Sequence, residues 1–121
     1  MSKTIMVVDD SASVRNVVGI ALKGAGYDVI EARDGADAIS KMKGKIHLIV
    51  SDVNMPNMDG ITFVKEVKKM ASYKFTPICM LTTESEQAKM MDGKAAGAKA
   101  WIVKPFQPQK LLDAVSKLVL P

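Results

Sequence analysis

The sequence predicts an α/β fold in which helices cover both faces of a doubly wound, five-stranded parallel sheet. The order of the expected elements supports this fold class. Apolar runs of strand length alternate along the chain with longer segments whose apolar residues recur at helical spacing. This alternation is typical of a parallel sheet, because each right-handed crossover between neighbouring parallel strands is made by a helix.

Five strands are expected, at residues 5–8, 27–32, 46–51, 77–81 and 100–103. Most of them are nearly continuous apolar runs, which is typical of strands buried on both faces of a parallel sheet. Residues 27–32 alternate apolar and polar side chains more clearly than the other runs. We therefore expect this second strand to lie nearer an edge of the sheet.

The first two helices have clear start and stop signals. Ser11 and Ser13 open the first helix, and Gly26 supplies its stop. Its inner face is expected to contain the apolar residues Val14, Val17, Val18, Ala21, Leu22 and Ala25. A short second helix follows Asp34 and Gly35, and its inner side is expected at Ala38, Ile39 and Met42.

The remaining three helices are marked in the same way. The third follows Gly60, with apolar positions at Phe63, Val64, Val67, Met70 and Ala71. The fourth is expected at residues 84–96, because acids lie in its first turn and Gly97 follows it. Pro108 opens the fifth, whose expected inner face is Leu111, Leu112, Val115, Leu118 and Val119.

Length and composition indicate a small protein without a membrane anchor. The 121 residues suffice for one core, so a single domain at residues 1–121 without an output domain is expected. No apolar stretch approaches the roughly 18 residues of a membrane span. Residues 1–4 lack the layout of a signal peptide. These features predict a cytoplasmic protein.

The rarest side chains and the net charge of +4 do not indicate a nucleophilic enzyme or a nucleic-acid-binding protein. We interpret Cys79 and His47, the only cysteine and the only histidine, as packed strand residues. Small lysine clusters usually mark solvated helix faces, and no aromatic residues are interleaved with them as in nucleic-acid-binding surfaces. The two clusters are Lys41, Lys43 and Lys45, and Lys65, Lys68 and Lys69. An acidic protein partner is therefore expected rather than nucleic acid.

Three aspartates follow two of the expected strands. Asp52 comes after the run Leu48 to Val50, and Asp9 and Asp10 come after the first strand. Alone, Asp52 could simply cap a turn. If the two strands end side by side, however, three carboxylates meet, which is unfavourable unless a cation or a proton intervenes. Mg²⁺ prefers oxygen ligands and typically takes one or two carboxylates together with phosphate. A magnesium site is therefore predicted.

Two further polar residues follow strands at the same edge, namely Thr82 after the fourth and Lys104 after the fifth. Ligands of doubly wound sheets bind outside the carboxyl ends of the strands. Carboxylates, a hydroxyl and an ammonium group together suit phosphoryl transfer, which needs positioning and charge stabilisation. Asp52 is the expected nucleophile, because a carboxylate can form an acyl phosphate.

Four short motifs together resemble a response-regulator receiver domain of the chemotaxis type. They are DD at 9–10, SDVNMPNMDG at 51–60, LTT at 81–83 and VKPF at 103–106. The resemblance extends over the whole chain. It implies the flavodoxin-like strand order 2-1-3-4-5, which the periodicity of the sequence does not supply.

The resemblance also implies a role for individual residues. Asp52 would be the phosphoacceptor, and Asp9 and Asp10 would hold Mg²⁺ directly or through water, together with Asp52. The backbone carbonyl of Asn54 would bind the same metal. Lys104 would contact the phosphoryl group and Thr82 would move toward it. The peptide bond between Lys104 and Pro105 would be cis. The site is thus expected to contain Asp9, Asp10, Asp52, Asn54, Thr82, Lys104 and Pro105.

Trp101 is expected to report the switch, since in this family an aromatic residue on the fifth strand swings inward behind the moving hydroxyl of Thr82. The alternative is a half-buried edge-strand aromatic with no such role. The output surface would be the fourth helix, the fifth strand and the fifth helix, with lysines along or near it at Lys89, Lys99, Lys104 and Lys110. Asn54 and Glu84 match the chemotaxis type at positions that tune the lifetime of the phosphoryl group.

The implied function is a signalling switch that catalyses only its own phosphorylation and dephosphorylation. A histidine kinase would be the phosphodonor. The target would be an acidic segment of a flagellar motor switch protein, and a phosphatase would be a further partner of the monomer.

Alternative functions with the same chemistry are a phosphorelay intermediary or a phosphate sink. A haloacid-dehalogenase-type phosphatase is disfavoured, because it needs a second Asp as general acid at the position that Asn54 occupies. In a flavin mononucleotide carrier, Asp9 and Asp10 would repel the phosphate. A calcium-binding EF-hand needs Gly where Asn57 stands.

Overall fold

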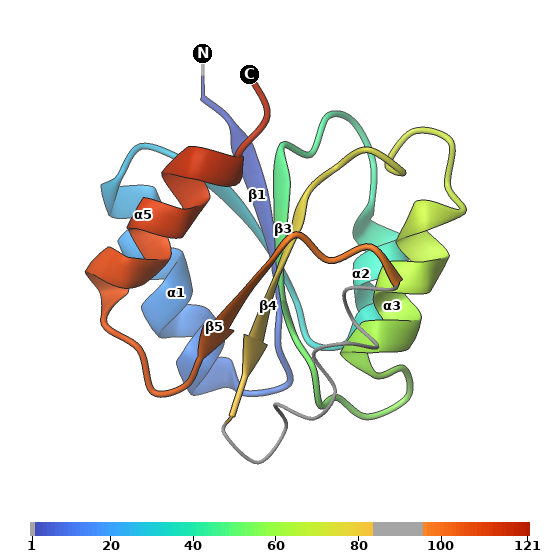
Figure 1. Cartoon of the computed structure of the whole chain (residues 1–121), viewed down its shortest axis with the longest axis horizontal. Coiled ribbons are helices and arrows are strands. Elements are labelled where there is room, and N and C mark those ends of the chain that lie inside the picture. Colours follow the sequence, from blue (N-terminus) through green and yellow to red (C-terminus); the bar gives the residue numbers. More distant parts are fainter. Residues whose placement is uncertain (1, 84–95) are drawn as a thin grey trace.

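The computed structural model describes residues 2–83 and 96–121, and their strands and helices alternate as the sequence predicts (Figure 1). The elements in chain order are β1 Thr4–Val8, α1 Ala12–Gly24, β2 Asp28–Ala32, α2 Gly35–Lys41, β3 Leu48–Asp52, α3 Gly60–Lys68, β4 Ile78–Thr82, β5 Ala100–Val103 and α5 Pro108–Leu118. The helix predicted at 84–96, with Glu84 and Lys89, lies outside the described residues except for Ala96.

The five strands form one parallel sheet in the order β2-β1-β3-β4-β5, which confirms the predicted fold class and strand order. Helices α1 and α5 cover one face, and α2 and α3 cover the other (Figure 1). β2 lies at an edge, as its alternating pattern predicts. All strands point the same way, so their carboxyl ends share one edge of the sheet.

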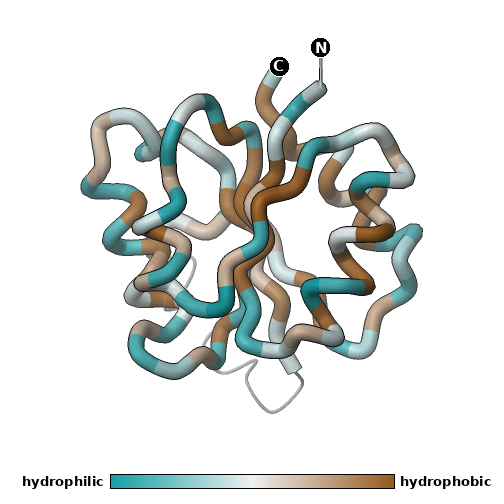
Figure 2. The backbone as a smooth tube through the Cα atoms, turned by 180° about the vertical axis from the view of Figure 1, so that it is seen from behind, coloured by the Kyte–Doolittle hydropathy of each residue, from teal (hydrophilic) through white to brown (hydrophobic). Residues whose placement is uncertain are grey.

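The hydrophobic core has two halves, because side chains of a strand alternate between the two faces of the sheet. In β1, Ile5 and Val7 pack with α1 and α5, whereas Met6 and Val8 pack with α2 and α3. The centre of the sheet is accordingly hydrophobic and the outer helix surfaces are more polar (Figure 2). None of the helices in the described part of the chain has the length and apolar character needed to cross a membrane.

The helix starts confirm the predicted capping residues. The Val14 amide donates to Ser11 Oγ over 3.3 Å, and the Asp37 amide donates to Asp34 Oδ1 over 2.8 Å. Such bonds satisfy amides that have no partner within the helix. Pro108 occupies the first turn of α5, where its missing N–H costs nothing.

Several predicted boundaries were wrong by one to three residues. Tyr27 is not yet part of β2, because its amide still bonds the Leu22 carbonyl at the end of α1. The strand predicted at 46–51 is shifted toward the C-terminus, so that Asp52 is the last residue of β3 rather than the residue after it. Met70 and Ala71 lie beyond α3, because the chain turns after Lys68.

Three side-chain placements also differ from the prediction. Val17 and Ala25 of the predicted inner face of α1 are exposed, because α1 packs through Val18, Gly19 and Leu22. Val17 borders an open groove of about 420 Å³ between α1 and the loop at Pro105 and Phe106. Lys68 is not fully solvated, since its Nζ donates to the carbonyl oxygens of Lys74 and Thr76.

Candidate functional site

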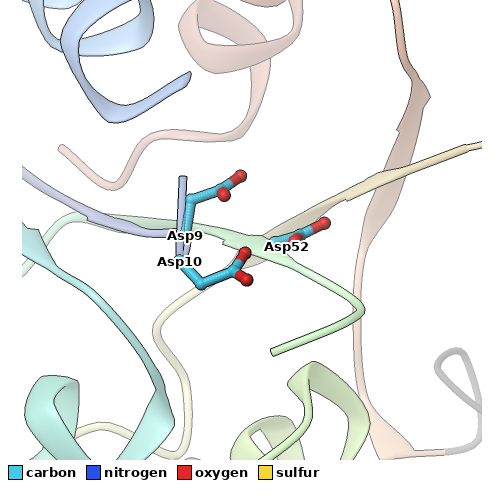
Figure 3. Close-up of side chains that lie close together, drawn as sticks. All are labelled: Asp9, Asp10 and Asp52. Atoms are coloured by element: carbon cyan, nitrogen blue, oxygen red, sulfur yellow. The ribbon is translucent and has the colours of Figure 1, made fainter. Parts of the chain in front are cut away.

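Asp9, Asp10 and Asp52 meet at the carboxyl edge of the sheet, as predicted. β1 and β3 are neighbours, and their register pairs Val8 with Ser51, so the residues that follow also lie side by side. Each aspartate offers one carboxylate oxygen, and these oxygens all lie within 4.8 Å of one another. Figure 3 shows the three side chains at neighbouring strand ends. Asp9 and Asp52 are buried, whereas Asp10 is exposed to solvent.

Local hydrogen bonds fix the orientation of the two buried carboxylates. The Ser11 amide donates to Asp9 Oδ1 over 2.9 Å, and the Val53 amide donates to Asp52 Oδ1 over 3.0 Å. The Asp9 amide in turn donates to the Ala32 carbonyl at the end of β2. These bonds hold the carboxylates at the edge of the sheet and keep them from folding back over the strands.

Lys104 links the two buried acids. Its Nζ lies 3.2 Å from Asp9 Oδ2 and 3.0 Å from Asp52 Oδ1. Burial alone would lower the pKa of Lys104, but the hydrogen bond that Lys104 donates to Asp52 and the charges of Asp52 and Asp9 outweigh it, so the pKa is raised. The side chain therefore stays an ammonium ion and offsets part of the negative charge of the cluster.

Thr82 and the peptide after Lys104 complete this edge. Thr82 is the last residue of β4, pairs with Val103 of β5 and is completely buried. Its hydroxyl donates to the Thr83 carbonyl over 3.2 Å. The Lys104–Pro105 peptide bond is cis, the isomer that the resemblance implies. Asn54 is exposed in the loop after β3, and its role as a metal ligand stays a prediction.

Trp101 is partly buried and packs against the core half that lies under α2 and α3. Its indole N–H is buried and has no hydrogen-bond acceptor among the residues that the structure describes. Both readings of this residue include a partly buried aromatic, and a change of its rotamer on activation stays a prediction.

Cys79 is a packed strand residue, as predicted, whereas His47 has a structural role just before β3 and is not part of the strand. Cys79 is completely buried in β4, and burial raises the pKa of its thiol to about 12, so that it is not a thiolate at neutral pH. His47 Nδ1 accepts a hydrogen bond from the Thr4 amide over 3.0 Å, which ties the chain just before β3 to β1.

A hydrogen bond between two side chains holds the loop after β3, and the sequence did not reveal it. Asn57, with a φ of 67°, donates from Nδ2 to Asp34 Oδ2 over 2.9 Å. The other oxygen of Asp34 caps α2. The amide of Asp37 and then the side chain of Asn57 lower the pKa of the Asp34 carboxyl. Asp and Asn pairs of this kind have no local spacing rule, so a motif search does not find them.

Asp34→Ala is expected to destabilise the protein by about 1–2 kcal/mol at neutral pH, because the helix cap and the bond to Asn57 are lost. The lowered pKa means that this stability is present above the unfolded-state value near 3.8 and is lost as the pH falls through the folded-state value. The difference in the free energy of unfolding between wild type and Asp34→Ala, measured in urea, should therefore shrink below about pH 4. Asp28→Ala, an exposed acid on β2, is the control and should change little.

Gly60 is required at the start of α3 by close backbone contact with the site. A Cβ at this position would lie 2.1 Å from the Asp52 carbonyl oxygen and 2.9 Å from Val53 Cα. Gly60→Ala is therefore expected to lower the free energy of unfolding by about 3 kcal/mol, measured in urea. Gly24→Ala is the matched control, since a Cβ there meets nothing within 4 Å, and it should be neutral or stabilising. Equal effects of the two substitutions would contradict this role for Gly60.

The whole chain is similar to receiver domains of known structure and sequence. A family model described as the response regulator receiver domain matches residues 5–116. The chemotaxis protein CheY of Bacillus subtilis is 39% identical over 119 residues, which covers 97% of this chain and 98% of that protein. The chemotaxis response regulator CheY4 of Vibrio cholerae, known from a high-resolution structure, is 47% identical, with a TM-score of 0.91 and coverage of 98% and 99% of the two chains.

A third comparison concerns the fold alone. The receiver domain of a sensor histidine kinase from Pseudomonas aeruginosa, solved with a magnesium ion coordinated in its active site cleft, is 24% identical. It has a TM-score of 0.88, and the likeness covers 98% of both chains. With the sheet order and the acid cluster, these findings show that this chain belongs to the response regulator receiver domain family and is similar to two-component signalling switches of the chemotaxis CheY type.

Proposed function

We propose that the chain is a phosphorylation-activated chemotaxis switch that acts as a cytoplasmic monomer. A histidine kinase donates a phosphoryl group to Asp52 with the help of Mg²⁺, and the charge that this adds alters a docking surface for the flagellar motor switch. The observation that carries this proposal is the meeting of three carboxylates with one ammonium group at the carboxyl edge of the sheet.

The donor set fits Mg²⁺. Its members are hard carboxylate oxygens from Asp9, Asp10 and Asp52, which lie within 4.8 Å of one another and include one exposed acid. Mg²⁺ prefers such ligands and keeps several waters, so it needs access to solvent. When bound, the ion would neutralise charge on the acids and on the transferred phosphoryl group. A related receiver domain of similar fold is described with magnesium in its active site cleft.

Asp52 is positioned to act as the nucleophile. Its Oδ1 is engaged by Lys104 and by the Val53 amide, so the carboxylate plane is fixed relative to the open side of the site. A carboxylate oxygen attacks the phosphorus atom of phosphohistidine, the new P–O bond gives an acyl phosphate, and the P–N bond breaks. The imidazole leaves with the bonding electron pair and takes up a proton. Lys104 then stabilises negative charge on the phosphoryl oxygens.

Thr82 is suited to transmit the effect of phosphorylation at Asp52 to Trp101. Its hydroxyl now donates to the carbonyl of the next residue, Thr83, a bond that it can exchange for a phosphoryl oxygen. Met80 of β4 pairs with Trp101 of β5, so Thr82 and Trp101 lie on adjoining strands. A shift of the hydroxyl toward Asp52 changes the space next to β5, and the bulky indole responds to that change.

The proposed target docks on β5 and α5. A groove of about 310 Å³ lies there, lined by Ala100, Ala114 and Leu118 together with two lysines, Lys110 and Lys117, and one acid, Asp113. Apolar residues flanked by lysines suit an acidic amphipathic segment, and Lys99 is exposed just before β5. The overall charge of +4 acts in the same direction, because it favours encounter with an acidic partner.

The proposal is tested by anisotropy of a labelled acidic segment from the flagellar motor switch protein. Affinity should rise at least about tenfold when both Mg²⁺ and acetyl phosphate are present, which corresponds to a coupling within the usual range for allosteric proteins. Neither Mg²⁺ alone nor acetyl phosphate alone should raise the affinity. If phosphorylation leaves this affinity unchanged but phosphate passes to a histidine phosphotransfer domain, the protein is a relay intermediary and the motor target is wrong.

A further inference from the structure

Arg15 on α1 contacts the backbone between the first two acids of the site. Its Nη1 donates to the Asp9 carbonyl oxygen over 2.6 Å, and its Nε lies 3.4 Å from Glu31 Oε1 on β2. The side chain of Arg15 is only 20% exposed, although arginine is usually at the surface. This side chain thus connects helix α1, the edge strand β2 and the end of β1.

The carbonyl that Arg15 contacts belongs to the peptide group between Asp9 and Asp10. Asp9 is also held by its amide, which donates to Ala32, and by its carboxylate, which accepts from Ser11. Asp10 is exposed, and no comparable side-chain bond is found for it in the described part of the chain. The plane of this peptide contributes to the direction in which the Asp10 side chain leaves the backbone, and the hydrogen bond from the guanidinium group restrains that plane.

Glu31 keeps the guanidinium group in place. A planar fork can bond two groups at once, and here it joins a carbonyl oxygen and a carboxylate. The Glu31 side chain is 42% exposed, so its ion pair with Arg15 is partly screened and acts as the weaker of the two contacts. A lysine at position 15 has a single ammonium group and cannot reproduce this fork.

We propose that Arg15, held by Glu31, is a positioning residue for the metal site: it fixes the Asp9–Asp10 peptide and so presents the Asp10 carboxylate to the cation shared with Asp9 and Asp52. This inference rests on the proposed magnesium site. Groups that orient metal ligands typically change metal affinity about tenfold to hundredfold when they are removed. The same loss is expected here, although Arg15 touches neither the ion nor the phosphoryl group.

The test is calorimetric titration of the full chain with MgCl₂, and it separates positioning from simple charge. Removing a positive charge near three acids would by itself tighten Mg²⁺ binding. If Arg15 positions Asp10, Arg15→Met instead weakens binding about tenfold or more. Arg15→Lys, which keeps the charge, should restore only part of the affinity. Lys23→Met, an exposed residue of the same helix, is the control for charge and should leave binding unchanged.

A double-mutant cycle shows whether Arg15 acts through Asp10. Arg15→Met should have little further effect in an Asp10→Asn background, because the ligand that it orients is already lost. Glu31→Gln should weaken Mg²⁺ binding less than Arg15→Met, and it gives the same test if Arg15→Met does not fold. The Mg²⁺ concentration that gives half of the maximal rate of phosphorylation by acetyl phosphate should rise for Arg15→Met by the same factor as its calorimetric dissociation constant.

Three results would overturn the inference. They are tighter Mg²⁺ binding by Arg15→Met, unchanged binding together with lower stability in urea, and full additivity with Asp10→Asn. A wild-type protein that does not bind Mg²⁺ would instead contradict the proposed function itself. The failure of the inference and the failure of the proposed function therefore give different results.

Discussion

Asp52→Asn is expected to fold and to lose all phosphorylation by acetyl phosphate. The amide nitrogen and oxygen of asparagine cannot form the acyl phosphate that a carboxylate forms. The loss of one of three crowded negative charges should leave stability without Mg²⁺ equal to or higher than that of wild type. Intact-protein mass spectrometry after incubation with Mg²⁺ and acetyl phosphate measures the phosphorylated fraction directly.

Asp59→Asn is the matched control for this experiment. Asp59 lies in the loop that follows β3 and caps α3 by accepting from the Thr62 amide over 2.8 Å. Asparagine caps helices about as well as aspartate, so the fold should be kept and phosphorylation should proceed at the wild-type rate. Phosphorylation of Asp52→Asn to the wild-type level would show that another residue is the acceptor.

Lys104→Met is expected to have opposite effects on Mg²⁺ binding and on phosphorylation. Without its ammonium group the buried carboxylates of Asp9 and Asp52 lose their shared partner, so Mg²⁺ should bind more tightly. The phosphorylation rate should nevertheless fall by about 10²-fold or more, the usual cost of removing one electrostatic contact to a transition state. Calorimetry and phosphorylation at saturating Mg²⁺ measure the two effects separately.

The stability of Lys104→Met without Mg²⁺ provides a further check. We expect a loss of about 3 kcal/mol in urea at neutral pH, because two buried acids are left without their cation. Since the pKa of Lys104 is raised, its contribution is fully present below the unfolded-state value of 10.5 and is lost as the pH rises through the folded-state value. Lys110 is an exposed lysine on α5, so Lys110→Met should change neither the free energy of unfolding nor its dependence on pH. Equal behaviour of the two variants would contradict the role given to Lys104.

Much of the fold could be predicted from the sequence because apolar runs and capping residues act locally. The runs that became β1, β3, β4 and β5 were recognisable, and Ser11, Asp34 and Pro108 marked helix starts correctly. Strand order could not be predicted in this way, because periodicity indicates the type of an element and not which element lies beside it. The meeting of Asp9 with Asp52 depends on β1 and β3 being neighbours, and that order came from the resemblance.

The parts that were missed depend on contacts between distant elements. Val17 fits the helical pattern of α1, but it faces the groove at Phe106 rather than the sheet. Arg15 and Glu31 were not singled out in the sequence, because Arg15 donates to the backbone carbonyl of Asp9, a kind of contact that has no sequence signature, and Glu31 acts only through its ion pair with Arg15. Packing geometry decides these cases, and a sequence pattern carries no information about it.

The most direct test of the proposed mechanism is a crystal structure of the protein grown with Mg²⁺. We expect one ion coordinated by carboxylate oxygens from the group of Asp9, Asp10 and Asp52, at the distances of about 2.0 to 2.1 Å that Mg²⁺ requires. Lys104 should remain next to the Asp52 carboxylate. A structure in which these three acids bind no ion at millimolar Mg²⁺, or in which they have moved apart, would contradict the mechanism.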